Sequence, residues 1–366
     1  MSPSDYTFER DLARASTIPA RWYTDPAMLP LERERIFHRT WQAVGPASAV
    51  AVPGSYLAGD IVGEPVVITR GKDGRLRAMS NVCRHRGALL AQGQGQTTVL
   101  RCPYHAWSYS LDGALLGQPE FEGVENWDRT RVCLPRFHVE SWGPFVFVNL
   151  DAAAPDLAGI LGRIPEEVAA LGCPIERLRW SRRRDYVIEC NWKVYIDNYL
   201  EGYHLPAAHP GLFHFLDYAQ YRVETFRHYS SQIAPLRSGK GGEALYYWIF
   251  PTFMLNVYPD NLSSNLILPL GPDKTLTIFE WFAYEGEVPQ STIDFSDEIQ
   301  QEDIRICESV QRGLRSTHYH QGRYSVAREN GVHHFHGLLA DYLKGGDSGS
   351  GVGDWGKTPP GTRTLP

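Results

Sequence analysis

Two short segments, each holding one cysteine and one histidine, constrain the fold of this chain more than any other feature. The first is Cys83-x-His85 and the second is Cys102-x-x-His105, with sixteen residues between them. Two loops that each present a thiolate and an imidazole suit a [2Fe-2S] cluster in which two histidines replace two cysteines on one iron. A structural zinc site also takes two cysteines and two histidines, but zinc fingers group cysteine with cysteine and histidine with histidine. The mixed pairs therefore favour an iron-sulfur cluster as a cofactor.

The length and composition of the chain limit its folds and partners. With 366 residues, of which 43% are hydrophobic and 21% charged, the chain is long enough for two globular domains. Its net charge of −6 gives no basic surface for nucleic acid. The sequence has no apolar run of about 18 residues and no apolar segment at its start, so we expect a cytoplasmic protein that does not span a membrane.

The pattern of apolar residues predicts four segments. Residues 1–42 alternate charged and apolar positions at helical spacing, and we expect them to pack on the later domain. Residues 43–155 consist of short apolar runs between turns, which is typical of a small all-β domain. Residues 156–343 mix helices with strands, and the Gly-, Ser- and Pro-rich residues 344–366 are predicted to form a mobile tail. The predicted fold class is α+β.

Within residues 156–343 the sequence predicts helices and one antiparallel sheet. The helix expected at 191–204 ends before Pro206, because proline disfavours helix at the preceding residue. The helix expected at 297–314 begins after Ser296, which is its N-cap. The helices are expected at 156–171, 191–204 and 297–314, a strand at 186–189, and the sheet strands at 244–250, 253–258, 264–268 and 275–284.

The expected helix 191–204 carries a second group of candidate metal ligands. Asp197, Glu201 and His204 have the spacing i, i+4 and i+7, which places them on one helix face. The other faces are rich in aromatic residues, so this polar face indicates a buried polar function. His209 follows closely and is expected to turn back toward His204, so that both histidines bind one metal ion.

Two histidines need one carboxylate to complete the triad that holds iron(II) with open positions for O₂ and substrate. Asp303 is the candidate, because a rotation of about 100° per residue places it within the apolar stripe of the helix 297–314, with Glu302 about a quarter-turn away. A carboxylate on a core-facing stripe needs a partner, and iron(II) would be one. The stripe consists of Ile299, Ile306, Cys307, Val310 and Leu314.

These segments resemble one known family. Residues 82–87 and 101–107 resemble the Rieske domain, and residues 191–210 with 301–303 are similar to the catalytic domain of Rieske non-haem iron oxygenases, the alpha subunits of the ring-hydroxylating type. The resemblance implies a Rieske [2Fe-2S] domain before a helix-grip catalytic domain. It also implies that the cluster is bound by Cys83, His85, Cys102 and His105, and a mononuclear iron by His204, His209 and Asp303.

The resemblance further assigns Glu201 to the acidic residue that bridges the two metal centres. Most members that act on aromatic rings have aspartate at this position. Glutamate stands here instead, as in members similar to the carnitine and choline oxygenases. A ring-shaped homotrimer is implied, in which the cluster of one subunit faces the iron of its neighbour and His105 lies near Glu201 across the interface. Asp197 is interpreted either as a proton-relay residue or as a polar contact that fixes the helix.

The expected reaction is the oxidation of a small organic substrate by O₂. The chain has neither a dinucleotide-binding Gly-x-Gly-x-x-Gly nor a plant-type ferredoxin cysteine run, so a separate NAD(P)H-dependent reductase, with or without a ferredoxin, must supply electrons. Aromatic residues on the predicted sheet suggest a cage for the ammonium group of a choline- or betaine-like substrate, and a pocket for an aromatic ring fits them as well. These residues are Tyr246, Tyr247, Trp248, Phe250, Phe253, Tyr258, Phe279 and Trp281.

Three functions follow as alternatives from the sequence. The first is a monooxygenase that hydroxylates or demethylates a quaternary amine, and the second is an aromatic-ring hydroxylating dioxygenase. The third is an electron carrier or a structural zinc protein. Metal content separates the third from the others, because an oxygenase binds about three irons per chain, a carrier about two and a zinc protein none.

Overall fold

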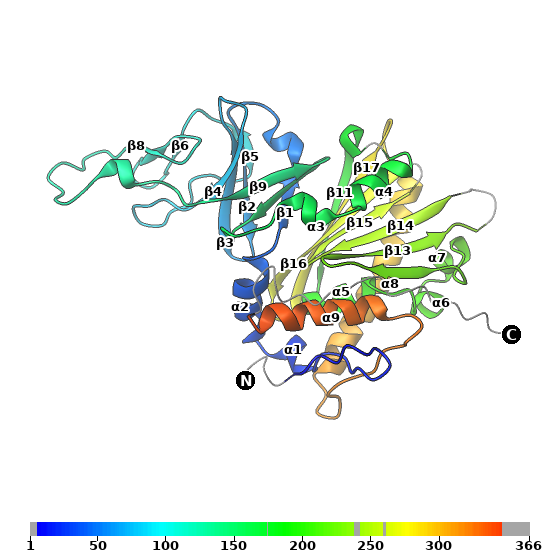
Figure 1. Ribbon diagram of the computed structural model, residues 1–366. Helices are drawn as coiled ribbons and strands as arrows, with labels where there is room; N and C mark the ends of the chain where they lie inside the picture. Colours follow the sequence, from blue (N-terminus) through cyan, green and yellow to red (C-terminus); the bar gives the residue numbers. More distant parts are fainter. Residues whose placement is uncertain (1–5, 174, 238–241, 259–260, 346–366) are drawn as a thin grey trace. The chain divides into compact units, whose positions relative to one another are not determined.

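The computed structural model divides into two compact units (Figure 1). The smaller unit comprises Phe37–Ala154, and the larger unit comprises Met1–Ile36 together with Pro155–Pro366. The predicted tail at 344–366 lies, from residue 346 onward, outside the described residues. The structure describes residues 6–173, 175–237, 242–258 and 261–345.

The smaller unit is built from short antiparallel strands. Seven strands form a sheet in the order β1-β10-β9-β4-β3-β2-β5, and three form a second sheet in the order β6-β7-β8. The all-β character predicted for this part of the chain is confirmed. The strands are β1 (Gln42–Pro46), β2 (Ser55–Ile61), β3 (Glu64–Arg70), β4 (Leu76–Ser80), β5 (Gln94–Gln96), β6 (Leu100–Arg101), β7 (Ser108–Tyr109), β8 (Leu115–Gly117), β9 (Arg136–Trp142) and β10 (Phe145–Asn149), with 3₁₀ turns at Ala47–Val50 and Arg129–Arg131.

The core of the smaller unit includes the cysteines of both cysteine-histidine segments. Cys83 and Cys102 are buried there with Trp107 and Tyr109. His85 and His105 are only half-buried. The core therefore holds each segment by its cysteine and leaves the histidines at its edge.

The larger unit contains one antiparallel sheet, as predicted. Its strand order is β11-β17-β16-β15-β14-β13-β12. Two of these strands, β12 and β13, were missed because their short polar sequences give a weak alternation signal. The strands are β11 (Arg179–Ile188), β12 (Arg222–Thr225), β13 (Tyr229–Pro235), β14 (Glu243–Ile249), β15 (Phe253–Val257), β16 (Asn261–Gly271) and β17 (Lys274–Ala283).

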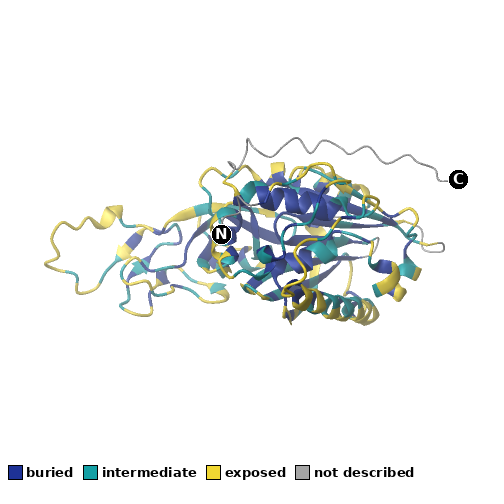
Figure 2. Ribbon diagram, turned by 90° about the horizontal axis from the view of Figure 1, so that it is seen from below, coloured by how far each residue is buried: buried dark blue, intermediate teal, exposed yellow. Residues whose placement is uncertain are grey.

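Helices cover this sheet on both faces. Neighbouring residues of a strand point to opposite faces: the Tyr247 hydroxyl donates to Glu167 of α4 (3.0 Å), whereas the Trp248 ring lies 5.3 Å from that of Phe335 on α9. Buried residues accordingly run along most of the sheet, while the loops are mainly exposed (Figure 2). The helices are α3 (Leu157–Leu161), α4 (Ile164–Ala170), α5 (Trp192–Tyr199), α6 (Leu205–Ala208), α7 (Pro210–Phe215), α8 (Gln290–Leu314) and α9 (Asn330–Leu343), with a 3₁₀ turn at Ile175–Arg177.

The N-terminal segment joins the larger unit through a buried ion pair. Its helices are short, α1 (Arg21–Thr24) and α2 (Met28–Glu32), and a π-helical turn follows at Arg33–Phe37. Glu32 accepts a hydrogen bond from Trp192 Nε1 (2.8 Å) and pairs with Lys193, and both charged side chains are fully buried. No helix among the described residues is both long and apolar enough to cross a membrane.

The helix predicted at 191–204 is shorter than expected, and this part of the prediction was wrong. It begins near the expected position, with Asn191 as N-cap, but α5 ends at Tyr199. The cause is the Glu201 carboxylate, which accepts hydrogen bonds from the backbone N–H groups of Tyr203 and His204 and so replaces helical bonds there. Asp197, Glu201 and His204 consequently do not lie on one helix face.

The helix predicted at 297–314 is longer than expected. It starts at Gln290 after Pro289, so Ser296 lies inside α8 instead of capping it. The predicted stripe was also partly wrong, since Val310 is 44% exposed. Two amides take part in the buried face instead, because Gln300 accepts the Tyr195 hydroxyl (2.6 Å) and Gln311 accepts the Asn191 N–H (2.8 Å).

Candidate metal centres and substrate cavity

The two cysteine-histidine segments fold into loops with the same backbone hydrogen bonds. In each loop the cysteine N–H donates to the carbonyl five residues on, and the N–H four residues on donates back to the cysteine carbonyl. These bonds measure 2.7 to 3.1 Å around Cys83 and Cys102. Gly87 and Ala106 occupy the same place in their loops and both have positive φ, 77° and 58°. Two equivalent loops therefore present one cysteine and one histidine each.

The histidines of these loops face each other. The ring centroids of His85 and His105 are 4.7 Å apart, and His85 also stacks on Trp107 at 4.8 Å. Both Nδ1 atoms are buried and make no hydrogen bond within the part of the chain that the structure describes. Burial and then the charge of Arg86 lower the pKa of His105, which favours the neutral imidazole that binds metals. Buried nitrogens of this kind need a ligand, so the residues fit a cluster.

The spacing of these four side chains disfavours a single zinc ion. Zinc lies about 2.0–2.3 Å from its ligands, which brings the ligand atoms of a tetrahedral site to within about 4 Å of one another. Only one group of three or more His, Cys, Asp and Glu among the described residues brings its ligand atoms within 4.8 Å, and it is a different group. The wider spacing suits a cluster of two irons and two sulfides.

That group consists of His204, His209 and Asp303 in the larger unit. Nε2 of His209 lies 3.0 Å from Oδ1 of Asp303, and Nε2 of His204 lies 4.0 Å from the same oxygen. His204 precedes α6, His209 separates α6 from α7, and Asp303 projects from the middle of α8. Two imidazoles and one carboxylate on one side of an ion are the ligand set of non-haem iron(II) sites with open positions. The structure thus brings the three predicted residues together, and they fit iron.

Each of these histidines holds a carboxylate on its other ring nitrogen. His204 Nδ1 lies 2.6 Å from Glu201 Oε1, and His209 Nδ1 lies 2.6 Å from Glu302 Oε2. Such contacts fix the ring and its tautomer, with Nε2 directed to a metal. Burial alone lowers the pKa of His209, but the carboxylates of Asp303 and Glu302 outweigh burial and raise it. No role was predicted for Glu302 from the sequence, although its place beside a candidate ligand was a usable signal.

Asp197 lies apart from this group. Its carboxylate accepts the Tyr23 hydroxyl (2.5 Å) and contacts His336 Nε2 (2.9 Å), which ties α5 to the N-terminal segment and to α9. These contacts favour the interpretation of Asp197 as a polar contact that fixes the helix. Its neighbour Asn198, which was not predicted, donates from Nδ2 to Asp303 Oδ1 (2.6 Å) and orients the ligand carboxylate.

A cavity of about 740 Å³ adjoins His204, His209, Asp303 and Glu201. The wall that the sheet contributes to this cavity is a row of side chains across five neighbouring strands. These side chains share a face because directly opposed residues of an antiparallel sheet do so. The strand register pairs each member of the row with the next, and all of them line the cavity. The row runs Gln232 (β13), Tyr246 (β14), Asn256 (β15), Ser263 (β16) and Trp281 (β17).

The aromatic cage predicted on the sheet is only half present. Tyr246, Tyr258, Phe279 and Trp281 line the cavity. The other four residues do not: strand alternation turns Tyr247 to the opposite face, Phe250 and Phe253 lie at strand ends, and Trp248 shares the face of Tyr246 but packs against α9. Tyr195, Tyr199 and Tyr221, which precede β13, add further aromatic surface.

Comparison with known proteins places the chain in a family. Residues 40–128 match the Rieske [2Fe-2S] domain, and residues 175–345 match the ring hydroxylating alpha subunit (catalytic domain). The chloroplastic choline monooxygenase of Arabidopsis thaliana is 38% identical over 359 residues, which cover 91% of this chain and 84% of that protein. The chain belongs to the Rieske oxygenase family.

Two further Rieske oxygenases are similar over almost their whole length. The carnitine monooxygenase oxygenase subunit of Escherichia coli (strain K12) is 35% identical, with 90% of this chain and 94% of that protein covered. A solved quaternary ammonium Rieske monooxygenase, described in relation to carnitine oxidation by gut microbiota and inter-subunit electron transfer, is 32% identical with a TM-score of 0.83. The match covers 92% of this chain and all of that one.

Membership of the Rieske oxygenases confirms several predictions. The chain is an oxidoreductase of the monooxygenase type with an α+β fold, and its cofactors are a [2Fe-2S] cluster and a mononuclear iron. The alternatives of an electron carrier and a structural zinc protein are excluded, because the chain also contains the catalytic domain.

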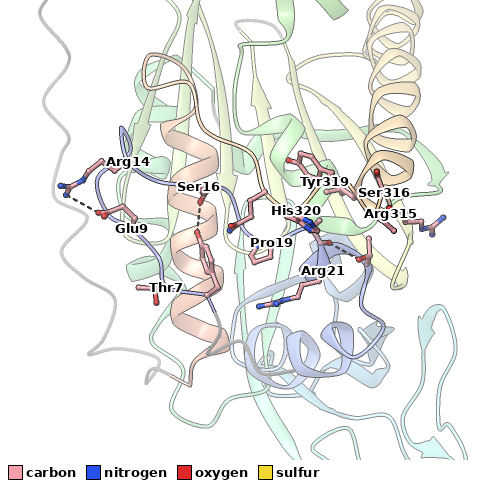
Figure 3. Close-up of a pocket in the computed structure, with 16 residues that line it drawn as sticks. Thr7, Glu9, Arg14, Ser16, Pro19, Arg21, Arg315, Ser316, Tyr319 and His320 are labelled. Carbon is pink, nitrogen blue, oxygen red and sulfur yellow. Dashed lines mark hydrogen bonds and ion pairs between the residues drawn. The ribbon is translucent and has the colours of Figure 1, made fainter.

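A second cavity of this Rieske oxygenase, of about 980 Å³, lies between the N-terminal segment and the residues that follow α8 (Figure 3). It is polar, but two of its arginines are already paired. Arg14 contacts Asp11 (3.0 Å) and Glu9 (3.8 Å), and Arg315 pairs with Asp273. None of the site residues predicted from the sequence lines it.

Proposed function

We propose that this Rieske oxygenase hydroxylates or demethylates a small quaternary ammonium compound in the 740 Å³ cavity. The observation that carries the proposal is the cavity itself. It combines aromatic faces, which attract quaternary ammonium groups, with the carboxylate of Glu201 beside the candidate iron ligands. The relatives named choline and carnitine monooxygenase support the same substrate class.

The proposed cofactor ligands follow from the two sites. The cluster would be held by Cys83, His85, Cys102 and His105 in a cluster domain of residues 43–155. The iron would be held by His204, His209 and Asp303 in a catalytic domain of residues 156–343, to which residues 1–42 are joined. When bound, the iron supplies a centre at which O₂ is activated.

The reaction requires electrons from outside the chain. Insertion of one oxygen atom of O₂ into a C–H bond, with reduction of the other to water, consumes two electrons and two protons. A separate NAD(P)H-dependent reductase, with or without a ferredoxin, would supply these electrons to the cluster. A hydroxylated N-methyl group would then leave as formaldehyde.

Glu201 is the proposed link between the cluster and the iron. It holds His204 through Nδ1 at 2.6 Å, and its side chain is 11% exposed. In the proposed homotrimer, His105 of a neighbouring subunit would meet this carboxylate, so that Glu201 holds one histidine of each metal centre in register. The predicted cytoplasmic location stays a prediction, since the plant relative is chloroplastic.

The test is turnover by the holoenzyme that has been reduced anaerobically and freed of reductant. The enzyme is mixed with O₂ and a panel of quaternary amines, and products are measured by mass spectrometry together with formaldehyde. The proposal predicts an oxygenated or demethylated product from a quaternary amine. Oxidation of a fused aromatic hydrocarbon alone would contradict it and favour the aromatic-ring dioxygenase.

A further inference from the structure

The wall of the substrate cavity contains an uncharged polar group with an unused donor. We propose that the cavity selects quaternary ammonium substrates whose other end is an uncharged hydrogen-bonding group, such as an alcohol, over those that end in a carboxylate. Asn265 is the residue that determines this specificity. The inference rests on the proposed function and names its substrate class more closely.

Hydrogen bonds inside the wall fix the orientation of Asn256. Its Oδ1 accepts the Tyr199 hydroxyl (2.9 Å), and its Nδ2 donates to Ser263 Oγ (3.1 Å) and to Asn265 Oδ1 (3.2 Å). Both ends of the Asn256 amide are therefore occupied within the protein. This amide in turn fixes Asn265 with its oxygen toward the wall.

Asn265 is left with a donor that faces no protein acceptor. It is 4% exposed and lines the cavity, and its Nδ2 makes no hydrogen bond to any residue that the structure describes. Ser263 is 6% exposed, and its hydroxyl hydrogen is free to point into the same space. A substrate that displaces water from this donor must supply an acceptor in return, so a polar group of the substrate is expected here.

The charges around the cavity decide what kind of polar group it accepts. Glu201 and Asp303 line the cavity, whereas no lysine or arginine does so among the described residues. Two arginines that do not line the cavity bind backbone carbonyls of residues that do. Arg237 donates to the Leu216 carbonyl (2.8 Å), and Arg328 donates to the Tyr221 carbonyl (3.2 Å).

A carboxylate beside Asn265 would find no lysine or arginine among the described lining residues as a partner and would be repelled by Glu201, whereas the charge of Asp303 is offset by the iron that it would bind. Burying an unpaired anion costs far more than burying a hydroxyl that has hydrogen-bond partners. The ammonium end is favoured by the Glu201 carboxylate and by the rings of Tyr246 and Trp281, which flank Asn256 and Ser263 in the sheet row. Charge complementarity thus separates two classes of quaternary amine that have the same cationic head.

The experiment is a direct competition between two substrates of nearly equal size, choline and glycine betaine, which end in an alcohol and a carboxylate. Reduced holoenzyme receives both at equal concentration with O₂, and the ratio of their products gives the ratio of kcat/KM. Wild type is expected to favour choline by at least about tenfold. Equal or preferred oxidation of glycine betaine would overturn the inference and leave the proposed function intact. Oxidation of neither would overturn the inference, and oxidation of no amine in the panel would overturn the proposed function as well.

Variants at Asn265 test its role. Asn265→Leu removes the donor at similar volume and should lower the preference for choline about two- to tenfold, mainly through KM. Asn265→Lys supplies a cation and should shift the preference toward glycine betaine. Ser264→Ala is the matched control, because Ser264 precedes Asn265 in β16 and does not line the cavity. Iron content and the visible spectrum of the cluster show whether each variant is intact. If an Asn265 variant is not intact, Ser263→Ala takes its place in the experiment. An unchanged ratio in the intact Asn265 variants would overturn the assignment.

Discussion

Glu302 Oε2 lies 2.6 Å from His209 Nδ1, on the side of the ring opposite to Asp303. The two consecutive carboxylates of α8 therefore contact both nitrogens of one imidazole. Asp303 lies at the Nε2 side of the His209 ring, where the candidate metal position is. Glu302 holds the ring from the other side, so that Nε2 keeps facing that position. His209 is 1% exposed, so water cannot replace the Glu302 contact without rearrangement.

The first prediction concerns this contact. Glu302→Gln should weaken iron(II) binding about 10- to 100-fold, since losing the carboxylate makes the His209 ring less basic and less well oriented. Iron titration of the apo site, with cluster absorbance as an internal standard, measures the effect. Glu298→Gln, an exposed position on the same helix, is the control. Equal iron affinity in both variants would show that Glu302 has no positioning role.

The second prediction concerns Glu201. Glu201→Gln keeps an oxygen that accepts from His204 Nδ1, so iron should remain bound. The amide nitrogen cannot accept the Tyr203 and His204 N–H groups or take the place of the carboxylate toward a neighbouring cluster histidine. Stopped-flow reoxidation of the reduced cluster by O₂ with substrate should slow about 10- to 100-fold. Fast reoxidation with normal iron content would remove Glu201 from the electron path.

The third prediction uses the equivalence of the two cluster loops. Gly87 and Ala106 both have positive φ, and a Cβ at Gly87 would meet nothing within 4 Å. Gly87→Ala should therefore cost only the backbone strain, about 1–2 kcal/mol, whereas Ala106→Gly should be neutral or slightly stabilising. Thermal loss of the cluster chromophore gives the order of stability. The reverse order would mean that the loops are not equivalent.

The fourth prediction concerns the buried pair Glu32–Lys193. Burial lowers the pKa of Lys193 against the opposing effect of Glu32, so this ammonium depends on its partner. Glu32→Gln should destabilise the larger unit by about 3–5 kcal/mol by leaving a buried charge unpaired. Adding Lys193→Met should recover much of that loss, because it removes the unpaired buried charge. The amide introduced by Glu32→Gln still accepts from Trp192 Nε1 in the double variant. Urea unfolding of the single and double variants measures the coupling, and additive effects would contradict it.

The sequence predicted those features that depend on residue type and on short spacing. The candidate cluster ligands could be proposed because Cys-x-His and Cys-x-x-His fix donor types within single loops. His204 and His209 were found together because only four residues separate them. The sheet strands β14 to β17 were found from their long apolar runs.

Features that depend on competition between local and tertiary contacts were not predictable. The end of α5 is set by the Glu201 carboxylate, which satisfies backbone donors that a helix would otherwise use. The division of the aromatic residues between cavity and core depends on the strand register, since Tyr246 and Tyr247 are equivalent in type. The contact between Glu302 and His209 spans 93 residues of sequence, and no spacing rule reaches that far.

The most direct test of the two-site account is the metal content of wild type and of His204→Ala after anaerobic purification. Wild type should contain about three irons and two acid-labile sulfides per chain, with a Rieske-type EPR signal after reduction. His204→Ala should lose about one iron, keep both sulfides and retain the signal unchanged. Loss of sulfide and of the signal in this variant, or retention of all three irons, would contradict the assignment of separate cluster and iron sites.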